Sequence, residues 1–195
     1  MSAPSARRAA FLDRDGVLVD ELDFLTDPER LVLLPGAARA VARLNASGLA
    51  VCCITNQSAI ARGLLSEERL LAIHERLAEL LAREGARLDG VFHCPHHPDV
   101  GPARYRIACQ CRKPAPGLIL RAARELRLEL ATSWLVGDAA RDLEAGRRAG
   151  LTRLVLVRTG KGRAEWERMD ARQRDGVRGV EDLSAAVDLV LAHEG

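Results

Sequence analysis

Residues 11–17, FLDRDGV, run from an apolar segment directly into two carboxylates that lie one residue apart and precede a glycine. Two carboxylates so close repel each other, so they require a cation, a proton or a chemical function. The residues that lead into them, 9–12, are apolar throughout, which is typical of a strand buried on both faces of a parallel sheet. The stretch therefore predicts a buried strand that ends at an acidic site.

Similar apolar runs recur along the chain and alternate with segments of helical periodicity. This alternation predicts right-handed βαβ units and an α/β fold, a three-layer Rossmann-like parallel sheet of about five strands with helices on both faces. Residues 160–179 are polar and predict a loop or a short helix. The expected strands are 9–12, 49–55, a weak 91–93, 134–137 and 154–157, and the expected helices are 37–46, 67–83, 116–126, 140–149 and 181–192.

The helix expected at 67–83 carries the clearest signals at its ends and along one face. Ser66 can cap its first turn, acidic residues at 67 and 68 suit its dipole, and Gly85 can end it. Its apolar stripe is expected to comprise Leu70, Leu71, Ile73, Leu77, Leu80 and Leu81.

The composition indicates one globular domain over residues 1–195, because 48% of the residues are apolar and can fill a core. The 29 basic and 27 acidic residues give a net charge of +2, which does not indicate a nucleic-acid or membrane partner. No secretory signal precedes the acidic pair, and no segment approaches the roughly 20 apolar residues that span a bilayer. We therefore expect a cytoplasmic protein, and a monomer.

Polar residues follow several of the expected strands. In an open parallel sheet, ligands bind beyond the carboxyl ends of the strands, so these residues are expected to converge on one edge. Each motif alone also occurs as an ordinary turn or helix cap, and it is their joint order that favours a functional site. The residues concerned are Asp13, Asp15, Thr55, Asn56, Asp138 and, just before a helix, Lys113.

This set of groups suits phosphoryl transfer. Mg²⁺ takes carboxylate and phosphate oxygens, and it would relieve the repulsion around Asp13. One carboxylate can attack phosphorus while Asp15 gives and later takes a proton. The Thr55 hydroxyl and the Lys113 ammonium can hold the equatorial oxygens, and Gly16 allows a sharp turn beside the phosphate.

The motifs DRDGV, ITNQS, CRKP and GDAARD occur in the order of the four motifs of the haloacid dehalogenase superfamily, and the resemblance covers almost the whole chain. Within it, FLDRDGV, TNQSAIARG, CPHHPD, CQCRKPAPG, VGDAARDLEAG and VLVRTGKG resemble the phosphatases of heptose 1,7-bisphosphate. The related phosphatases of histidinol phosphate share much of this pattern. The resemblance implies a Mg²⁺-dependent phosphatase that acts on a small phosphorylated sugar.

The resemblance also implies roles for individual residues. Asp13 would be the nucleophile and a Mg²⁺ ligand, and Asp138 would complete the metal site, supported by Asp142. Asp15 would be the general acid and base, with its backbone carbonyl on the metal. Thr55 and Lys113 would steady the phosphoryl group.

Substrate recognition would fall to neighbouring residues. Asn56, Gln57 and Ser58 would lie along the pocket, and Arg112 would bind the substrate through its second phosphate. Residues 21–27, ELDFLTD, should lie over the pocket, but they lack the histidine and tyrosine of the heptose enzymes, which leaves histidinol phosphate open as a substrate. The chain has no insertion large enough for a separate cap domain. A phospho-accepting signalling domain is a further alternative, although its acceptor would follow the third strand.

Four further residues form a C-x-H and C-x-C pair of motifs: Cys94, His96, Cys109 and Cys111. Three thiolates and one imidazole make a closed tetrahedral set of the structural zinc type, so residues 94–111 are predicted to be a zinc-stapled loop inserted in the domain. The resemblance points to the same four ligands. His97 is adjacent and could compete with His96. Free thiols or a redox pair are the alternatives to a zinc site.

Overall fold

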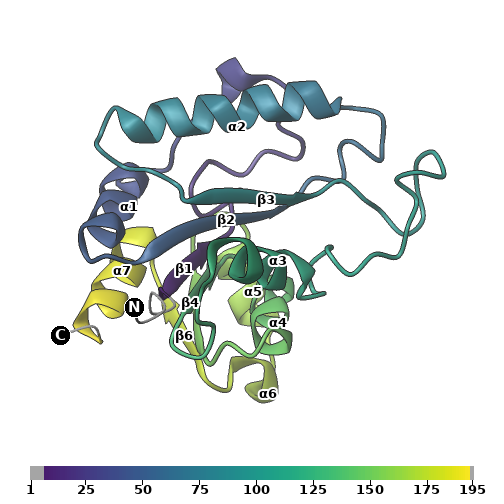
Figure 1. Cartoon of the computed structure of the whole chain (residues 1–195). Coiled ribbons are helices and arrows are strands. Elements are labelled where there is room, and N and C mark those ends of the chain that lie inside the picture. The colour runs from purple at the N-terminus through teal and green to yellow at the C-terminus, as the bar shows by residue number, and fades with distance from the viewer. Residues whose placement is uncertain (1–6, 194–195) are drawn as a thin grey trace, which may run out of the picture.

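The computed structural model describes residues 7–193, which form one six-stranded sheet in the order β3-β2-β1-β4-β5-β6 (Figure 1). Every neighbouring pair of strands is parallel, as the alternation of strands and helices predicts. The strands are β1 (Ala9–Leu12), β2 (Ala50–Asn56), β3 (Gly90–Cys94), β4 (Trp134–Gly137), β5 (Arg153–Val157) and β6 (Val177–Val180).

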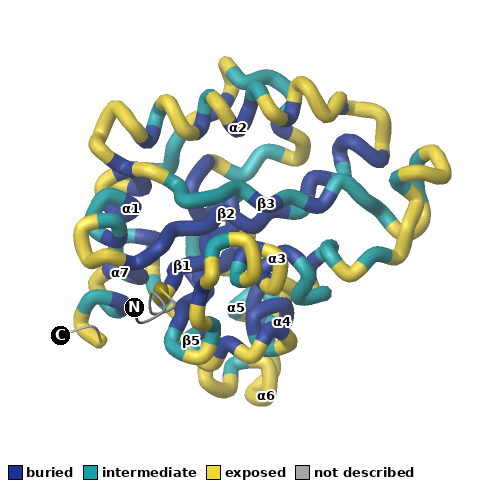
Figure 2. Tube along the Cα trace, in the orientation of Figure 1, coloured by how far each residue is buried: buried dark blue, intermediate teal, exposed yellow. Residues whose placement is uncertain are grey.

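Helices cover both faces of the sheet, and an apolar core lies between the sheet and the helices on each face (Figures 1 and 2). Phe11 and Leu12 illustrate the division, because neighbouring residues of a strand point to opposite faces and these two enter different cores. The first core contains residues of α1 (Ala37–Ala46), α2 (Glu67–Ala82) and α7 (Leu183–Ala192). The second contains residues of α3 (Gly117–Leu126) and α4 (Ala140–Arg148), and Trp166 of α5 (Gly162–Arg168) packs against it. The remaining helices are the short η1 (Pro28–Arg30) and α6 (Ala171–Arg174).

The strand order reverses between β1 and β4, and this reversal positions the candidate site. The chain proceeds outward from β1 to β2 and β3, and then returns to β4 on the other side of β1. Leu12 pairs with Val136, and the Asp13 amide donates to the Val136 carbonyl at 3.0 Å. The residues that follow β1 and β4 therefore meet in the crevice where open α/β sheets bind ligands.

The C-terminal part of the sheet differs from the prediction of about five strands. Residues 160–179, expected to be a loop or short helix, contain α5, α6 and the start of a sixth strand, β6. β6 has the sequence VRGV and lies at the edge of the sheet, with Arg178 and Gly179 exposed. An edge strand this short and this polar lacks the continuous apolar run by which the other strands are predicted.

Helix α2 begins at the predicted residue and ends at Ala82, one residue before the predicted end, and its buried stripe is narrower than expected. The Ser66 hydroxyl accepts a hydrogen bond from the Arg69 amide at 3.1 Å, as expected of an N-cap. Leu71 was expected on the buried face, but it is 55% exposed. Successive residues of a helix are rotated by about 100°, so residues four apart lie on the same face. His74, four residues after Leu70, therefore lies on the buried face.

Two of the connections that follow strands extend away from the sheet (Figure 1). Residues 94–111 form the longest projection from it, on the right of Figure 1, and the segment between β1 and α1 returns along the surface. Within residues 7–193 no separate cap domain covers the carboxyl edge of the sheet. None of the helices described there combines the length and apolar composition that crossing a membrane requires.

Replacing Ser66 with Ala is expected to destabilise the protein by about 1 kcal/mol, because the amide at the start of α2 loses its acceptor. Chemical unfolding measures the change, and Ser66→Asp serves as the matched control because its carboxylate restores an acceptor. A loss of the same size in both variants would contradict the capping role.

Candidate active site

Three carboxylates meet at the point where the strand order reverses. Asp13 follows β1, Asp138 follows β4, and Asp142 lies in the first turn of α4; each offers an oxygen within 4.8 Å of the others. One oxygen of Asp138 accepts the Lys161 amide at 2.9 Å, whereas its Oδ1 is buried and has no hydrogen-bond partner among residues 7–193. A buried, unpartnered carboxylate oxygen beside a second carboxylate fits a hard divalent cation such as Mg²⁺.

Glycines let the backbone approach the Asp138 carboxylate. A Cβ on Gly16 would lie 2.3 Å from Asp138 Oδ2, and Gly16 has a φ of +78°, which favours glycine. A Cβ on Gly160 would lie 2.5 Å from the Gly16 Cα. The Thr159 hydroxyl donates to the Gly16 carbonyl at 2.6 Å. The turn after β5 is thereby held against the loop after β1.

Lys113 lies inside the acidic cluster and not at its rim. Its Nζ is 2.9 Å from Asp13 Oδ2 and 2.8 Å from Asp142 Oδ1, and it donates to the Ile54 carbonyl at 2.9 Å. The Asn56 side chain fixes the backbone of Lys113, because it accepts from the Lys113 amide at 3.0 Å and donates to its carbonyl at 3.1 Å. Asn56 therefore positions the lysine in addition to facing the pocket.

The electrostatics of the cluster depend on burial. Burial raises the pKa of Asp13 to about 8; Lys113 opposes this rise, and the neighbouring carboxylates add to it. Burial, followed by Asp142, raises the pKa of Asp138 to about 7. Although burial alone would lower it, Asp13 and Asp142 raise the pKa of Lys113, which stays charged. Without a bound cation the cluster therefore favours the protonated forms of Asp13 and Asp138, because three carboxylates would carry more negative charge than one ammonium neutralises.

The Asp15 side chain faces a different set of partners. The Arg14 guanidinium donates hydrogen bonds to both oxygens of the Asp15 carboxylate. Nε lies 3.2 Å from Oδ1, and Nη2 lies 3.0 Å from Oδ1 and 3.1 Å from Oδ2. Gln57 Nε2 donates to Asp15 Oδ2 at 3.0 Å and to the Thr55 hydroxyl at 2.7 Å. Thr55, Gln57 and Asp15 thus form one network on the pocket wall.

A pocket of about 270 Å³ opens above these groups. As predicted, residues of the 21–27 segment lie over it, and Ser58 and Arg112 line it together with Asn56 and Gln57. The Arg112 guanidinium donates to the His96 carbonyl at 3.2 Å. Lys161 Nζ is 2.6 Å from a carboxylate oxygen of Glu21, which connects the segment over the pocket to the turn after β5.

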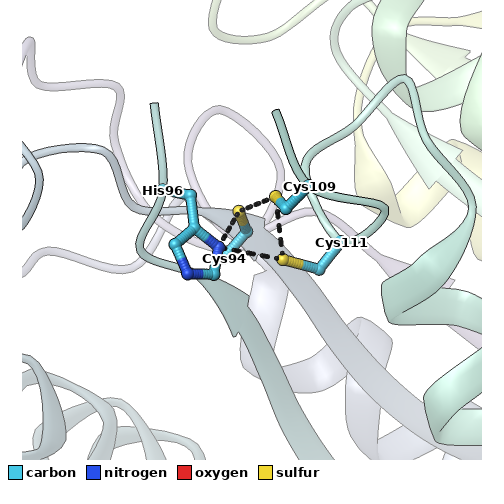
Figure 3. Close-up of side chains that lie close together, drawn as sticks. All are labelled: Cys94, His96, Cys109 and Cys111. Carbon is cyan, nitrogen blue, oxygen red and sulfur yellow. Dashed lines mark hydrogen bonds between the residues drawn. The ribbon is translucent and has the colours of Figure 1, made fainter. Parts of the chain in front are cut away.

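The structure brings the four predicted zinc-site residues together (Figure 3). Cys94 Sγ lies 3.5 Å from Cys109 Sγ, and Cys111 Sγ lies 3.1 Å from Cys109 Sγ and 3.3 Å from His96 Nδ1. These separations and the donor set of three sulfurs and one imidazole fit a tetrahedral Zn²⁺. His97 points elsewhere: its ring lies 3.2 Å from Arg62 Nη2 and accepts the Asp99 amide.

Sequence reasoning missed three basic residues of the pocket: Arg14, Arg141 and Lys161. Lys161 follows β5, so the rule that located residues at the ends of the other strands could have found it. Arg141 lies one residue after the start of α4 and carries no comparable signal. Arg14 stands between two carboxylates, where a basic residue reads as an exposed counter-charge, yet its side chain is only 1% exposed.

Comparisons with known proteins agree with this geometry. A family model described as HAD-hydrolase-like matches residues 110–186. The D-glycero-beta-D-manno-heptose-1,7-bisphosphate 7-phosphatase of Rhodopseudomonas palustris is 45% identical over 152 residues, 77% of this chain and 84% of that protein. The enzyme of the same name from Bordetella bronchiseptica is 40% identical over 181 residues, 92% of this chain and 96% of that protein.

A solved structure is similar over the same length. The crystal structure of D,D-heptose 1,7-bisphosphate phosphatase from B. bronchiseptica, complexed with magnesium and phosphate, has a TM-score of 0.86 and 38% identity, and covers 95% of this chain and 99% of that chain. The fold and the clustered carboxylates are those of a haloacid-dehalogenase-like hydrolase. Within that class, the chain belongs to the family of the heptose-bisphosphate phosphatases.

Mg²⁺ is expected to raise the melting temperature more at pH 8 than at pH 6. The pKa values of Asp13 and Asp138 are raised by folding, so the stability contributed by their protonated forms is present in acid and is lost as the pH rises through 7 to 8. Mg²⁺ then replaces the lost protons as counter-charge. Thermal unfolding with and without Mg²⁺ measures the difference, and the matched variant Asp138→Asn should lose it. An equal shift at both pH values would contradict this account.

Zinc removal is expected to loosen residues 94–111 while leaving the sheet intact, because the loop has little apolar core of its own. Hydrogen exchange before and after chelation measures the change. Cys111→Ser should reduce the bound zinc, whereas Cys52→Ala, in the core strand β2, should not. Unchanged exchange in the loop after complete zinc removal would rule out a structural metal.

Proposed function

We propose that the chain is a Mg²⁺-dependent phosphatase that removes the 7-phosphate from D-glycero-D-manno-heptose 1,7-bisphosphate through an aspartyl-phosphate. The observation that carries the proposal is the Asp13 carboxylate, which lines the pocket 2.9 Å from Lys113 Nζ and clusters with Asp138, whose Oδ1 has no partner among residues 7–193. The names of the relatives support the substrate.

In the first half of the reaction, an Asp13 oxygen attacks phosphorus and the bond from phosphorus to the sugar oxygen breaks. Asp15, in its protonated form, gives its proton to the leaving oxygen. In the second half, water attacks the phosphorus of the aspartyl-phosphate, its proton passes to Asp15, and the Asp13 carboxylate is regenerated. The cycle thus returns both residues to their starting forms.

Charge on the transferring phosphoryl group is balanced from several directions. Lys113, whose three donors are held by Asp13, Asp142 and the Ile54 carbonyl, supplies a fixed positive charge, and the Thr55 hydroxyl is available to an equatorial oxygen. Asp13, the Asp15 carbonyl and Asp138 would hold the Mg²⁺, and the ion would supply further positive charge to the phosphoryl group.

Recognition of the sugar falls to the outer part of the pocket. Arg112 presents a guanidinium suited to the second phosphate, and Asn56, Gln57 and Ser58 present polar groups along the wall. We assign zinc at Cys94, His96, Cys109 and Cys111 a structural role, because four protein ligands leave no position for substrate. We also propose a single domain over residues 1–195 that acts as a cytoplasmic monomer, a location in which unpaired thiols persist.

The test is phosphate release from the heptose bisphosphate and from histidinol phosphate, each with Mg²⁺. The heptose bisphosphate should be the better substrate by kcat/KM, and Asp13→Asn should abolish the release, whereas the surface variant Asp188→Asn should not. Equal, slow rates on both substrates would refute the substrate assignment, and undiminished hydrolysis by Asp13→Asn would refute the mechanism.

A further inference from the structure

Arg14 is a buried cation that forms an ion pair with Asp15. Its side chain is 1% exposed, and within residues 7–193 its ion pair is with Asp15, whose side chain is 20% exposed. Nε and Nη2 both contact the Asp15 carboxylate, whereas Nη1 has no hydrogen-bond partner in the described chain. A guanidinium is rarely placed in a core unless it is paired, so its position requires an explanation.

Two buried groups on which the Arg14 charge acts, His74 and Cys53, are themselves uncharged. Burial, with a smaller contribution from Arg14, lowers the pKa of His74 to about 3, so this histidine is neutral at ordinary pH. Burial likewise raises the pKa of the Cys53 thiol well above its usual range, and it stays protonated. The carboxylate that faces the pocket is therefore the natural partner of the Arg14 charge.

The contacts fix the orientation of the Asp15 carboxylate and not merely its charge. Arg14 donates from Nε to Oδ1 at 3.2 Å and from Nη2 to Oδ2 at 3.1 Å. Oδ2 also accepts from Gln57 Nε2 at 3.0 Å, with the Thr55 hydroxyl 3.5 Å away. A planar guanidinium makes two parallel contacts to a carboxylate, which a single ammonium does not reproduce. A group that transfers a proton must lie within hydrogen-bond reach of it, so an orientation held this firmly bears on the rate.

We propose that Arg14 is a positioning residue for the phosphatase reaction. Its planar guanidinium holds the Asp15 carboxylate in the orientation in which Asp15 exchanges protons with the leaving oxygen and the attacking water. The proposal rests on the proposed function. Arg14 itself gives up no proton. Its effect passes through Asp15.

The first experiment compares Arg14→Gln and Arg14→Lys with the wild type. Arg14→Gln should lower kcat by about 10- to 100-fold, the usual consequence of a misplaced catalytic group, with KM nearly unchanged. Arg14→Lys keeps the positive charge but loses the two parallel contacts of the guanidinium, so it should recover only part of the lost rate. Arg43→Gln, at a surface ion pair with Asp188, is the matched control and should keep wild-type kcat. Thermal unfolding shows that each variant is folded.

The second experiment is a double-mutant cycle with Asp15→Asn, followed by single-turnover phosphate release. If Arg14 acts through Asp15, adding Arg14→Gln to Asp15→Asn should slow the reaction no further; an additive loss would overturn the proposal. Wild-type kcat in folded Arg14→Gln or Arg14→Lys would also overturn it. If Arg14→Gln does not fold, Arg14→Lys takes its place in the cycle. A wild-type protein that releases no phosphate would instead refute the proposed function.

Discussion

The Lys113 ammonium, buried between the carboxylates of Asp13 and Asp142, is the interaction on which the rest of the site depends. An ammonium can donate three hydrogen bonds, and here three oxygens lie at 2.8–2.9 Å, the third being the Ile54 carbonyl. A buried charge is tolerated only when it is paired and its donors are satisfied. Three separate segments meet at this nitrogen, namely the ends of β1 and β2 and the first turn of α4.

The loop containing the cysteine cluster delivers Lys113 to that position. Cys94 ends β3, and Cys109 and Cys111 lie immediately before Arg112 and Lys113. Where the chain turns into α3, the Gly117 amide donates to the Gln110 carbonyl at 2.8 Å. A Cβ at Gly117 would lie 2.3 Å from that carbonyl oxygen. A metal bound by these cysteines would join β3 to the segment before α3, and it would constrain the pocket residue Arg112 together with the neighbouring Lys113.

Much of the fold could be predicted from the sequence because buried parallel strands are continuous apolar runs. β1 and β4 have the predicted boundaries, and Asp13 and Asp138 meet because their strands are neighbours. β6 could not be predicted, since an edge strand with Arg178 and Gly179 has no such run. Leu71 is apolar, but it lies about 100° around the helix from the buried Leu70 and therefore points away from the core.

The residues that make up the site could be predicted more readily than the contacts between them. Nothing in the order of residues indicates that Asn56 holds the backbone of Lys113, because the two lie 57 positions apart and the contact depends on how β2 ends. The burial of Arg14 was also hidden. A basic residue between two acidic ones is normally solvated, and only the turn after β1 directs it inward.

The contact between Gly16 and Gly160 limits how this molecule can diverge over evolutionary time. Neither position has room for even a methyl group, since a Cβ at either would overlap the Asp138 carboxylate. The glycines in the loops around the Asp138 carboxylate therefore tolerate almost no substitution. Adaptation to new compounds must instead arise at the rim, where exposed residues such as Asp23 and Phe24 can be exchanged without disturbing the backbone beneath them.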